Sequence, residues 1–251
     1  MAGASQEQVN EEMGNMKDLR AVTCLHAGAV LEGQIAGPDG PGPHPAVMVM
    51  HNAHGLGPQV RNTAQRLARC GYVAVAADMY GGGVYHSDAR AAGTSLEPLW
   101  KNPDLLRSRV LAWFELLKSM PAVDAGRVGA IGYCFGGQCV LELARSGAEV
   151  KAVVSYHGIL STAMPAKAGA VKAHVVVYTG ARDPYAPRAH VDALQDEMIA
   201  AGARWQITVF GEACHAFTDT DAVATRPGLA YDPLADRVSW AGTETLLSAL
   251  L

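Results

Sequence analysis

The sequence of 251 residues contains no apolar run that approaches the roughly 20 residues needed to cross a bilayer. It has no excess of basic charge either, since 20 Lys and Arg stand against 24 Asp and Glu and the formal net charge is −4. Proteins that bind nucleic acid typically carry a basic patch or stripe. We therefore expect neither a membrane nor a nucleic acid among the partners of this protein.

Cysteine is also scarce. The five cysteines are an odd number without the spacing of a disulfide framework, which favours reduced thiols and a cytoplasmic location. Met1 to Asp18 is polar and acidic and lacks the apolar stretch of a secretory signal. No linker-like or low-complexity stretch divides the chain. We expect residues 1–20 to be a polar tail and residues 21–251 to be a single domain.

After the tail, apolar segments that suit buried strands alternate with segments of helical periodicity. Residues 22–25 and 30–35, joined by a short turn, predict an antiparallel hairpin. Further strands are expected at 46–50, 72–77, 127–131, 150–156, 171–179 and 204–210, and helices at 60–70, 104–119, 138–145, 187–201 and from about 236 onward. This alternation predicts an α/β fold with a doubly wound, mostly parallel sheet and helices on both faces. Residues 80–100 are expected either to cap a pocket or to form a long surface connection.

One short motif carries the most chemical information. Residues 132–136 read Gly-Tyr-Cys-Phe-Gly and lie between a predicted strand and a predicted helix. The nucleophile elbow of α/β-hydrolases has this context, because a sharp strand-to-helix turn with small neighbours lifts the nucleophile above the sheet edge. Cys134 would then lie at a helix N-terminus, which favours the thiolate over the thiol. A glycine-rich turn with an inert, buried thiol would have the same pattern.

Two side chains further along the chain favour the elbow. Asp183 follows the strand predicted at 171–179, and His215 follows the strand predicted at 204–210. Elbow enzymes supply their triad in the order nucleophile, acid, base, and loops at the carboxyl edge of a parallel sheet lie close together. Taken singly, Asp183 is a common turn residue and His215 a common surface histidine. Together they predict a triad of Cys134, Asp183 and His215.

The chain resembles the dienelactone hydrolase family of α/β-hydrolases from about Val22 onward. The likeness is carried by residues 71–81 (Gly-Tyr-Val-Ala-Val-Ala-Ala-Asp-Met-Tyr-Gly), 132–137 (Gly-Tyr-Cys-Phe-Gly-Gly), 180–184 (Gly-Ala-Arg-Asp-Pro) and 214–219 (Cys-His-Ala-Phe-Thr-Asp). The resemblance implies the same triad and an oxyanion hole made of the N–H groups of Phe135 and Ala53. It also implies that esters or lactones are opened through an acyl-cysteine intermediate, without a cofactor.

Two positions depart from this resemblance. Family members that open dienelactone have a glutamate where this chain has Asn52, and an amide cannot take up the thiol proton. Activation of Cys134 would then fall to His215. Those members also hold the substrate carboxylate with arginine, one of them at the position of Asp219 here. A carboxylate at that position would repel an anionic substrate, which favours neutral ones.

Other residues are expected around the same site. His54, Tyr85 and His157 follow predicted strands and are expected to contact the substrate, together with Asn52 and Asp219. His51 and His54 have a spacing that suits metal ligands, but no further ligand has matching spacing, so no metal is expected. The sequence has no Gly-x-Gly-x-x-Gly around Cys134, which argues against a dinucleotide fold.

Three functions remain open at this point. The first is a cysteine-dependent hydrolase of small-molecule carboxylic esters or lactones. The second is a thioesterase or small-amide hydrolase with the same triad. The third is a catalytically silent α/β-hydrolase-like binding protein in which loss of the glutamate has inactivated the cysteine. We expect a monomer or a small homo-oligomer.

Overall fold

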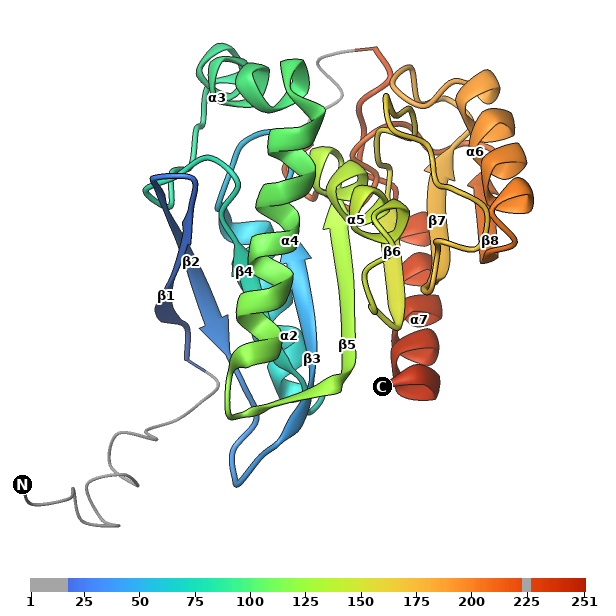
Figure 1. The fold of residues 1–251 in the computed structure, drawn as a ribbon. Helices are drawn as coiled ribbons and strands as arrows, with labels where there is room; N and C mark the ends of the chain where they lie inside the picture. Colours follow the sequence, from blue (N-terminus) through green and yellow to red (C-terminus); the bar gives the residue numbers. More distant parts are fainter. Residues whose placement is uncertain (1–17, 223–226) are drawn as a thin grey trace, which may run out of the picture.

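The strands expected from the sequence join into one mixed sheet in the computed structural model, which describes residues 18–222 and 227–251 (Figure 1). The eight strands lie in the order β1-β2-β4-β3-β5-β6-β7-β8. They are β1 (Arg20–His26), β2 (Ala29–Ala36), β3 (His44–Met50), β4 (Val73–Ala77), β5 (Val123–Tyr133), β6 (Ala152–Tyr156), β7 (His174–Gly180) and β8 (Arg204–Phe210). β2 pairs antiparallel with β1 and β4, and the other neighbouring strands pair in parallel.

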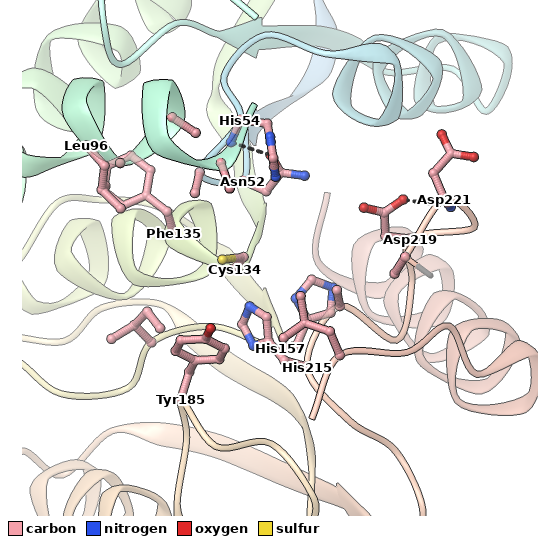
Figure 2. Close-up of a pocket in the computed structure, with 18 of the residues that line it drawn as sticks. Asn52, His54, Leu96, Cys134, Phe135, His157, Tyr185, His215, Asp219 and Asp221 are labelled. Carbon is pink, nitrogen blue, oxygen red and sulfur yellow. Dashed lines mark hydrogen bonds between the residues drawn. The ribbon is translucent and has the colours of Figure 1, made fainter. Parts of the chain in front are cut away.

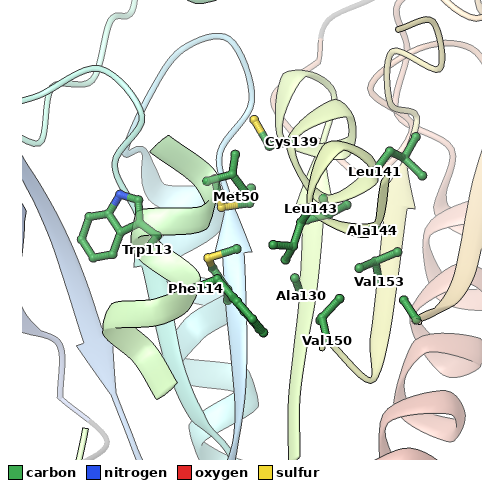
Figure 3. Close-up of a cluster of buried hydrophobic side chains, with 14 of the residues drawn as sticks. Met50, Trp113, Phe114, Ala130, Cys139, Leu141, Leu143, Ala144, Val150 and Val153 are labelled. Atoms are coloured by element: carbon green, nitrogen blue, oxygen red, sulfur yellow. The ribbon is translucent and has the colours of Figure 1, made fainter. Parts of the chain in front are cut away.

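Helices cover both faces of this sheet. Those within the described residues are α2 (Pro58–Arg69), α3 (Ala89–Lys101), α4 (Pro103–Ser119), α5 (Phe135–Arg145), α6 (Arg188–Ala200) and α7 (Pro233–Leu250). Buried side chains of α4, α5 and α6 belong to one apolar cluster and those of α2 and α7 to another. Figure 3 shows part of the first cluster, where Trp113 and Phe114 of α4 and Leu143 of α5 lie near Met50 of β3.

The central strands show why continuous apolar segments in the sequence predicted buried strands correctly. β4 and β6 are buried along their whole length, because helices cover both of their faces, and such strands are continuously apolar. Every predicted strand and helix is present, and the predicted doubly wound, mostly parallel sheet with an N-terminal antiparallel hairpin is confirmed. The tail predicted at 1–20 falls mostly outside the described residues, and β1 already begins at Arg20.

The segment 80–100, for which no helix is predicted, contains α3. Asp88 caps this helix, since its side chain accepts hydrogen bonds from the backbone N–H groups of Arg90 and Ala91. Gly93 and Pro98 interrupt the helical pattern of the sequence, and Pro98 lies inside the helix. Over the described residues, no helix is both long and apolar enough to cross a membrane.

The parallel strands place the candidate residues at one edge. β3, β5, β7 and β8 run in the same direction, so the loops that follow them meet at their carboxyl ends. Cys134 follows β5, Asp183 follows β7 and His215 follows β8. Residues 51–57 form the loop after β3 at the same edge.

Candidate active site

Cys134 lies in the turn between β5 and α5 in a backbone conformation that side-chain-bearing residues rarely adopt. Its φ is +54° and its ψ is −112°. A Cβ atom added to Gly132 would lie 2.0 Å from the carbonyl oxygen of Gly136, and one added to Gly136 would lie 2.2 Å from that of Met50. Close backbone packing therefore requires both glycines. The turn has the geometry of a nucleophile elbow.

His215 lies between Asp183 and Cys134. Its Nδ1 donates a hydrogen bond to Asp183 Oδ2 over 2.8 Å, and the backbone N–H of Tyr185 donates to the other carboxylate oxygen, also over 2.8 Å. The His215 and Asp183 side chains are 5% and 0% exposed. On its other side, the imidazole lies close enough to the side chain of Cys134 for each group to shift the pKa of the other. The structure thus brings the three residues of the predicted triad together.

This contact changes the protonation of both partners. Burial raises the pKa of the Cys134 thiol, but His215 and the backbone N–H groups of Phe135 and Ala53 lower it further than burial raises it. Burial lowers the pKa of His215, whereas the Cys134 thiolate and the Asp183 carboxylate raise it, to about 10 in total. The pair therefore favours a thiolate beside an imidazolium at neutral pH.

The two backbone donors predicted for an oxyanion hole face Cys134. Phe135 is the first residue of α5, where backbone N–H groups have no partner within the helix. Ala53 belongs to the loop after β3, and the Tyr80 hydroxyl donates to its carbonyl oxygen over 2.9 Å, which holds this peptide in place. Both N–H groups lower the pKa of the Cys134 thiol. Negative charge on an oxygen that forms beside the sulfur would meet the same donors.

A pocket of about 590 Å³ opens above these residues. In Figure 2, Cys134 lies between Asn52 and His54 on one side and His157, His215 and Tyr185 on the other. The lining residues are Asn52, Ala53, His54, Ser87, Asp88, Ala89, Ala92, Gly93, Leu96, Trp100, Cys134, Phe135, His157, Ile159, Tyr185, His215, Ala216, Asp219, Asp221, Ala222 and Leu229.

Four of the five residues expected to contact the substrate line this pocket, namely Asn52, His54, His157 and Asp219. Tyr85 does not. Its backbone pairs with Gly55, and its ring covers Gly57 so closely that a Cβ atom there would lie 2.5 Å from the Tyr85 Cε2 atom. The ring is 52% exposed, and we therefore no longer assign it to substrate binding.

The polar side chains of the loop after β3 are held by neighbours within the protein. Asn52 Oδ1 accepts from the backbone N–H of His54 over 2.8 Å, and Asn52 Nδ2 donates to Gln59 Oε1 over 3.2 Å. His54 Nδ1 donates to the carbonyl oxygen of His86 over 2.7 Å. These bonds tie the loop to α2 and to the segment that leads into α3.

Apart from the Cys134–His215 pair, the charged side chains that line the pocket are acidic. Asp88, Asp219 and Asp221 line it, and no Lys or Arg is among its described lining residues. Asp219 Oδ1 accepts from the backbone N–H of Asp221 over 3.0 Å, so that both acidic residues belong to one turn beside the site (Figure 2). An anionic substrate would find no Lys or Arg among these residues, and the charge of the His215 imidazolium is already balanced by Cys134 and Asp183.

The sequence left open whether residues 80–100 cap the pocket, and it did not predict the helix by which they do so. α3 contributes Ala92, Gly93, Leu96 and Trp100, and the loops after β6 and β7 contribute Ile159 and Tyr185. The signal that could have revealed α3 is Asp88, an acidic residue of the type favoured at helix N-caps. Nothing in the sequence around Tyr185 distinguishes it from an ordinary surface tyrosine.

His51, which was considered as a metal ligand, uses both ring nitrogens in hydrogen bonds. Nδ1 donates to the carbonyl oxygen of Asn52 over 2.6 Å, and Nε2 accepts from the backbone N–H of Met79 over 3.0 Å. A ligand needs a free lone pair, and His51 offers none. Across the part of the chain that the structure describes, no three His, Cys, Asp or Glu side chains are grouped to hold a metal ion.

The strand order and the elbow between β5 and α5 define an α/β-hydrolase. More narrowly, the model of the dienelactone hydrolase family matches residues 31–251, and the chain belongs to that family. Membership supports hydrolase activity on lactone- or ester-type substrates.

Three relatives illustrate the match. The structure of a dienelactone hydrolase-like promiscuous phosphotriesterase from metagenomic libraries has a TM-score of 0.86 at 35% identity and covers 93% of this chain and 98% of its own. Carboxymethylenebutenolidase from Pseudomonas putida is 26% identical over 219 residues, which are 81% of this chain and 89% of the relative. An uncharacterized protein from Caenorhabditis elegans is 34% identical over 141 residues, 55% of this chain and 89% of the relative.

Proposed function

We propose that the protein hydrolyses neutral carboxylic esters or lactones through an acyl-cysteine intermediate, with Cys134 as nucleophile, His215 as acid and base, and Asp183 as the residue that orients His215. The observation that carries this proposal is the contact of Cys134 with His215 and of His215 with Asp183, within a pocket lined by Cys134. Family membership supports the reaction class.

Acylation begins with the thiolate. The Cys134 sulfur attacks the carbonyl carbon, a C–S bond forms, and the carbonyl electron pair moves onto oxygen, where the N–H groups of Phe135 and Ala53 stabilise it. When this pair returns, the C–O bond to the leaving group breaks. The His215 imidazolium gives its proton to the departing alkoxide, which leaves as an alcohol or, from a lactone, as the hydroxyl end of the same chain.

Deacylation uses the neutral imidazole that remains. His215 takes a proton from water, and the resulting hydroxide attacks the acyl carbon. The C–S bond then breaks, which releases the carboxylic acid and restores the thiolate beside the imidazolium. Asp183 accepts the Nδ1 hydrogen bond throughout and keeps Nε2 directed at the reacting atoms. The neutral Asn52 takes no proton in this sequence.

The pocket supports neutral rather than anionic substrates. Three carboxylates line it without a Lys or Arg among the described lining residues, and Leu96, Trp100 and Ile159 add apolar surface. Cleavage of thioesters or small amides would use the same triad, so these remain alternative substrates. A cytoplasmic location suits a nucleophile that must stay reduced, and all five cysteines are free.

A turnover screen tests this proposal. Activated esters, lactones, thioesters and anilides of matched acyl groups are offered to the wild type and to Cys134→Ala, with a neutral phosphotriester added because one relative is described by that activity. We expect hydrolysis of neutral esters or lactones that the variant lacks. Turnover retained by Cys134→Ala would remove Cys134 as nucleophile, and no turnover of any substrate would favour a silent binding protein.

A further inference from the structure

A line of four hydrogen bonds connects the loop after β3 with the wall of the pocket beside His215. The backbone N–H of His54 donates to Asn52 Oδ1 over 2.8 Å, and Asn52 Nδ2 donates to Gln59 Oε1 over 3.2 Å. Gln59 Nε2 donates to Thr218 Oγ1 over 3.1 Å, and Thr218 Oγ1 is 2.8 Å from His157 Nε2. The line joins three segments that are far apart in the sequence, namely residues 52–59, the loop after β6 and the loop after β8.

The backbone donor at its start fixes the direction of the two amide bonds that follow, and with it the atom that Gln59 presents to Thr218. A backbone N–H can only donate, so the Asn52 atom beside it is the oxygen and the other is the NH₂ group. The NH₂ of Asn52 needs an acceptor, so the Gln59 atom that it meets is the oxygen. The NH₂ of Gln59 then donates to Thr218, whose single hydroxyl proton is left for His157 Nε2. With Thr218 donating to it, Nε2 accepts, and a neutral His157 carries its proton on Nδ1, a buried nitrogen without a hydrogen-bond partner among the described residues.

His157 is held against the residue proposed as acid and base. It is 1% exposed, and its ring lies edge-on to His215, with 5.2 Å between the ring centroids. Phe217 packs edge-on as well, at 5.0 Å, and Tyr133 lies at 6.1 Å. The residue has a φ of +39°, a strained value that the surrounding contacts maintain. The titratable groups whose rings face it are His215 and Tyr133.

We propose that Gln59 and Thr218 are positioning residues that hold His157 as a neutral ring with an unprotonated Nε2, and that this neutral ring preserves the imidazolium of His215 beside Cys134. The second half of the proposal rests on the function proposed above, whereas the first half concerns only the protonation of His157. Nothing in the hydrogen-bond argument depends on the reaction.

Protonation of His157 would disturb this arrangement in two ways. A protonated Nε2 would donate to Thr218, whose oxygen would then accept from both Gln59 and His157 while its hydroxyl proton lost Nε2 as its acceptor. It would also place a second positive charge next to His215 in a site with little solvent. In agreement, burial and the charge of His215 hold the pKa of His157 well below its ordinary value.

The same line gives Asn52 a role. A carboxylate at position 52 could accept from the backbone N–H of His54 but could not donate to Gln59. The direction of the whole line therefore depends on an amide there. This accounts for an asparagine at the position where dienelactone-opening members of the family have a glutamate.

Variants of Gln59 with nearly the same shape distinguish the effect of hydrogen-bond direction from the effect of side-chain packing. In Gln59→Glu, both side-chain oxygens accept, so Thr218 must donate to Glu and must accept from His157, which requires a proton on Nε2. In Gln59→Met, no polar atom remains at that position and the Thr218 proton stays available to Nε2. Gln59 is only half-buried, so both variants are expected to fold. Thr218→Ser keeps the hydroxyl and Thr218→Val removes it.

Two-bond ¹H–¹⁵N correlation spectra of protein labelled at histidine report the protonation of each ring, and His157→Gln assigns the signals of His157. We expect a proton on Nδ1 alone in the wild type, Gln59→Met and Thr218→Ser, on both sides of neutral pH. Gln59→Glu should move it to Nε2 or protonate both nitrogens. A wild-type proton on Nε2, or an unchanged ring in Gln59→Glu, would overturn the assignment.

The same spectra show whether the charge of His157 affects the pH at which His215 loses its proton. If His157 becomes charged in Gln59→Glu, His215 should lose its proton at a lower pH than in the wild type, and the alkaline limb of kcat/KM should move with it. In Thr218→Val, the added change Gln59→Glu should have little further effect, because the connecting hydroxyl is gone. A charged His157 with an unmoved His215 titration would refute the coupling. Hydrolysis by Cys134→Ala would refute the proposed triad but not the state of His157.

Discussion

At the scale of single residues, the pKa values of Cys134 and His215 are shifted in opposite directions. Cys134 is a stronger acid than an ordinary cysteine and His215 a stronger base than an ordinary histidine, because each stabilises the charged form of the other. Neither shift could arise from burial alone, since burial disfavours both charged forms. Reactivity of Cys134 should therefore depend on His215.

Alkylation by iodoacetamide measures this dependence. We expect Cys134 to react first at neutral pH, although Cys70 is exposed and Cys134 is only half-buried, because the thiolate is the nucleophile. The rate should reach half of its maximum below the ordinary cysteine pKa. In His215→Ala, burial remains while the stabilising charge is lost, so the midpoint should move upward and the neutral-pH rate should fall. Peptide mapping of the labelled cysteine checks the order, and faster labelling of Cys70 would contradict it.

We expect Asp219 to contribute to the charge preference of the pocket, which it lines together with Asp88 and Asp221. Its Oδ1 accepts from the backbone N–H of Asp221, and an amide oxygen can replace that acceptor, so Asp219→Asn removes the charge while keeping the turn. We expect the turnover ratio of an anionic to a neutral ester of similar size to rise in Asp219→Asn and further in Asp219→Arg, the latter by about ten-fold for a screened charge pair at contact distance. A wild-type preference for the anion would show that Asp219 points away from bound substrate.

At the scale of elements, the sequence predicted the sheet better than the pocket. Buried parallel strands are apolar throughout and the helices are amphipathic, so their periodicity survives in the sequence. The elbow was predictable because both of its glycines are required by close backbone contacts, that of Gly132 with Gly136 and that of Gly136 with Met50, and therefore appear in the sequence as a short motif. α3 was missed because Gly93 and Pro98 break its pattern. Tyr85 was misplaced because its orientation depends on the pairing of two distant loops, at Gly55 and Tyr85.

α3 forms one wall of the pocket while burying few side chains, of which Ala92 and Leu99 are the fully buried ones. Its N-cap should therefore matter to binding. Asp88→Ala removes the acceptor for two backbone N–H groups and should cost about 1 kcal/mol of helix stability. We expect faster amide exchange in α3 and a higher KM, with a smaller change in kcat.

Two controls isolate the cap from other effects of this change. Asp88→Ser removes the charge but keeps a capping oxygen, so it should retain the KM of the wild type if the cap is what matters. Asn102→Ala removes the corresponding cap of α4, which lies outside the pocket lining, and should lower stability without changing KM. Equal KM values for Asp88→Ala and Asn102→Ala would mean that the α3 cap has no role in binding.

At the scale of the whole molecule, buried neutral histidines link folding to pH. Burial lowers the pKa of His51 and of His157 in the folded protein below 6.5, the value expected when the chain is unfolded. The unfolded chain then binds more protons than the folded one below that pH, so stability falls as the pH is lowered. The raised pKa of His215 works the other way, but its contribution is already complete below 6.5.

His51→Gln tests this linkage, because glutamine can both donate and accept in place of the ring. Urea unfolding at a series of pH values should show a shallower fall in the free energy of unfolding below pH 6.5. The difference in slope should approach one proton, or about 1.4 kcal/mol per pH unit. Parallel slopes for the two proteins would mean that His51 is protonated in the folded state.

The proposed mechanism requires that the acyl group of the substrate is bound covalently to Cys134 during turnover. Mass spectrometry of the wild type and of Cys134→Ala, acid-quenched during hydrolysis of a neutral ester, tests this most directly. We expect an added acyl mass on the peptide that contains Cys134, formed and lost at rates consistent with turnover, and none in the variant. Steady hydrolysis without that adduct, or an adduct on another residue that turns over equally well in Cys134→Ala, would contradict it.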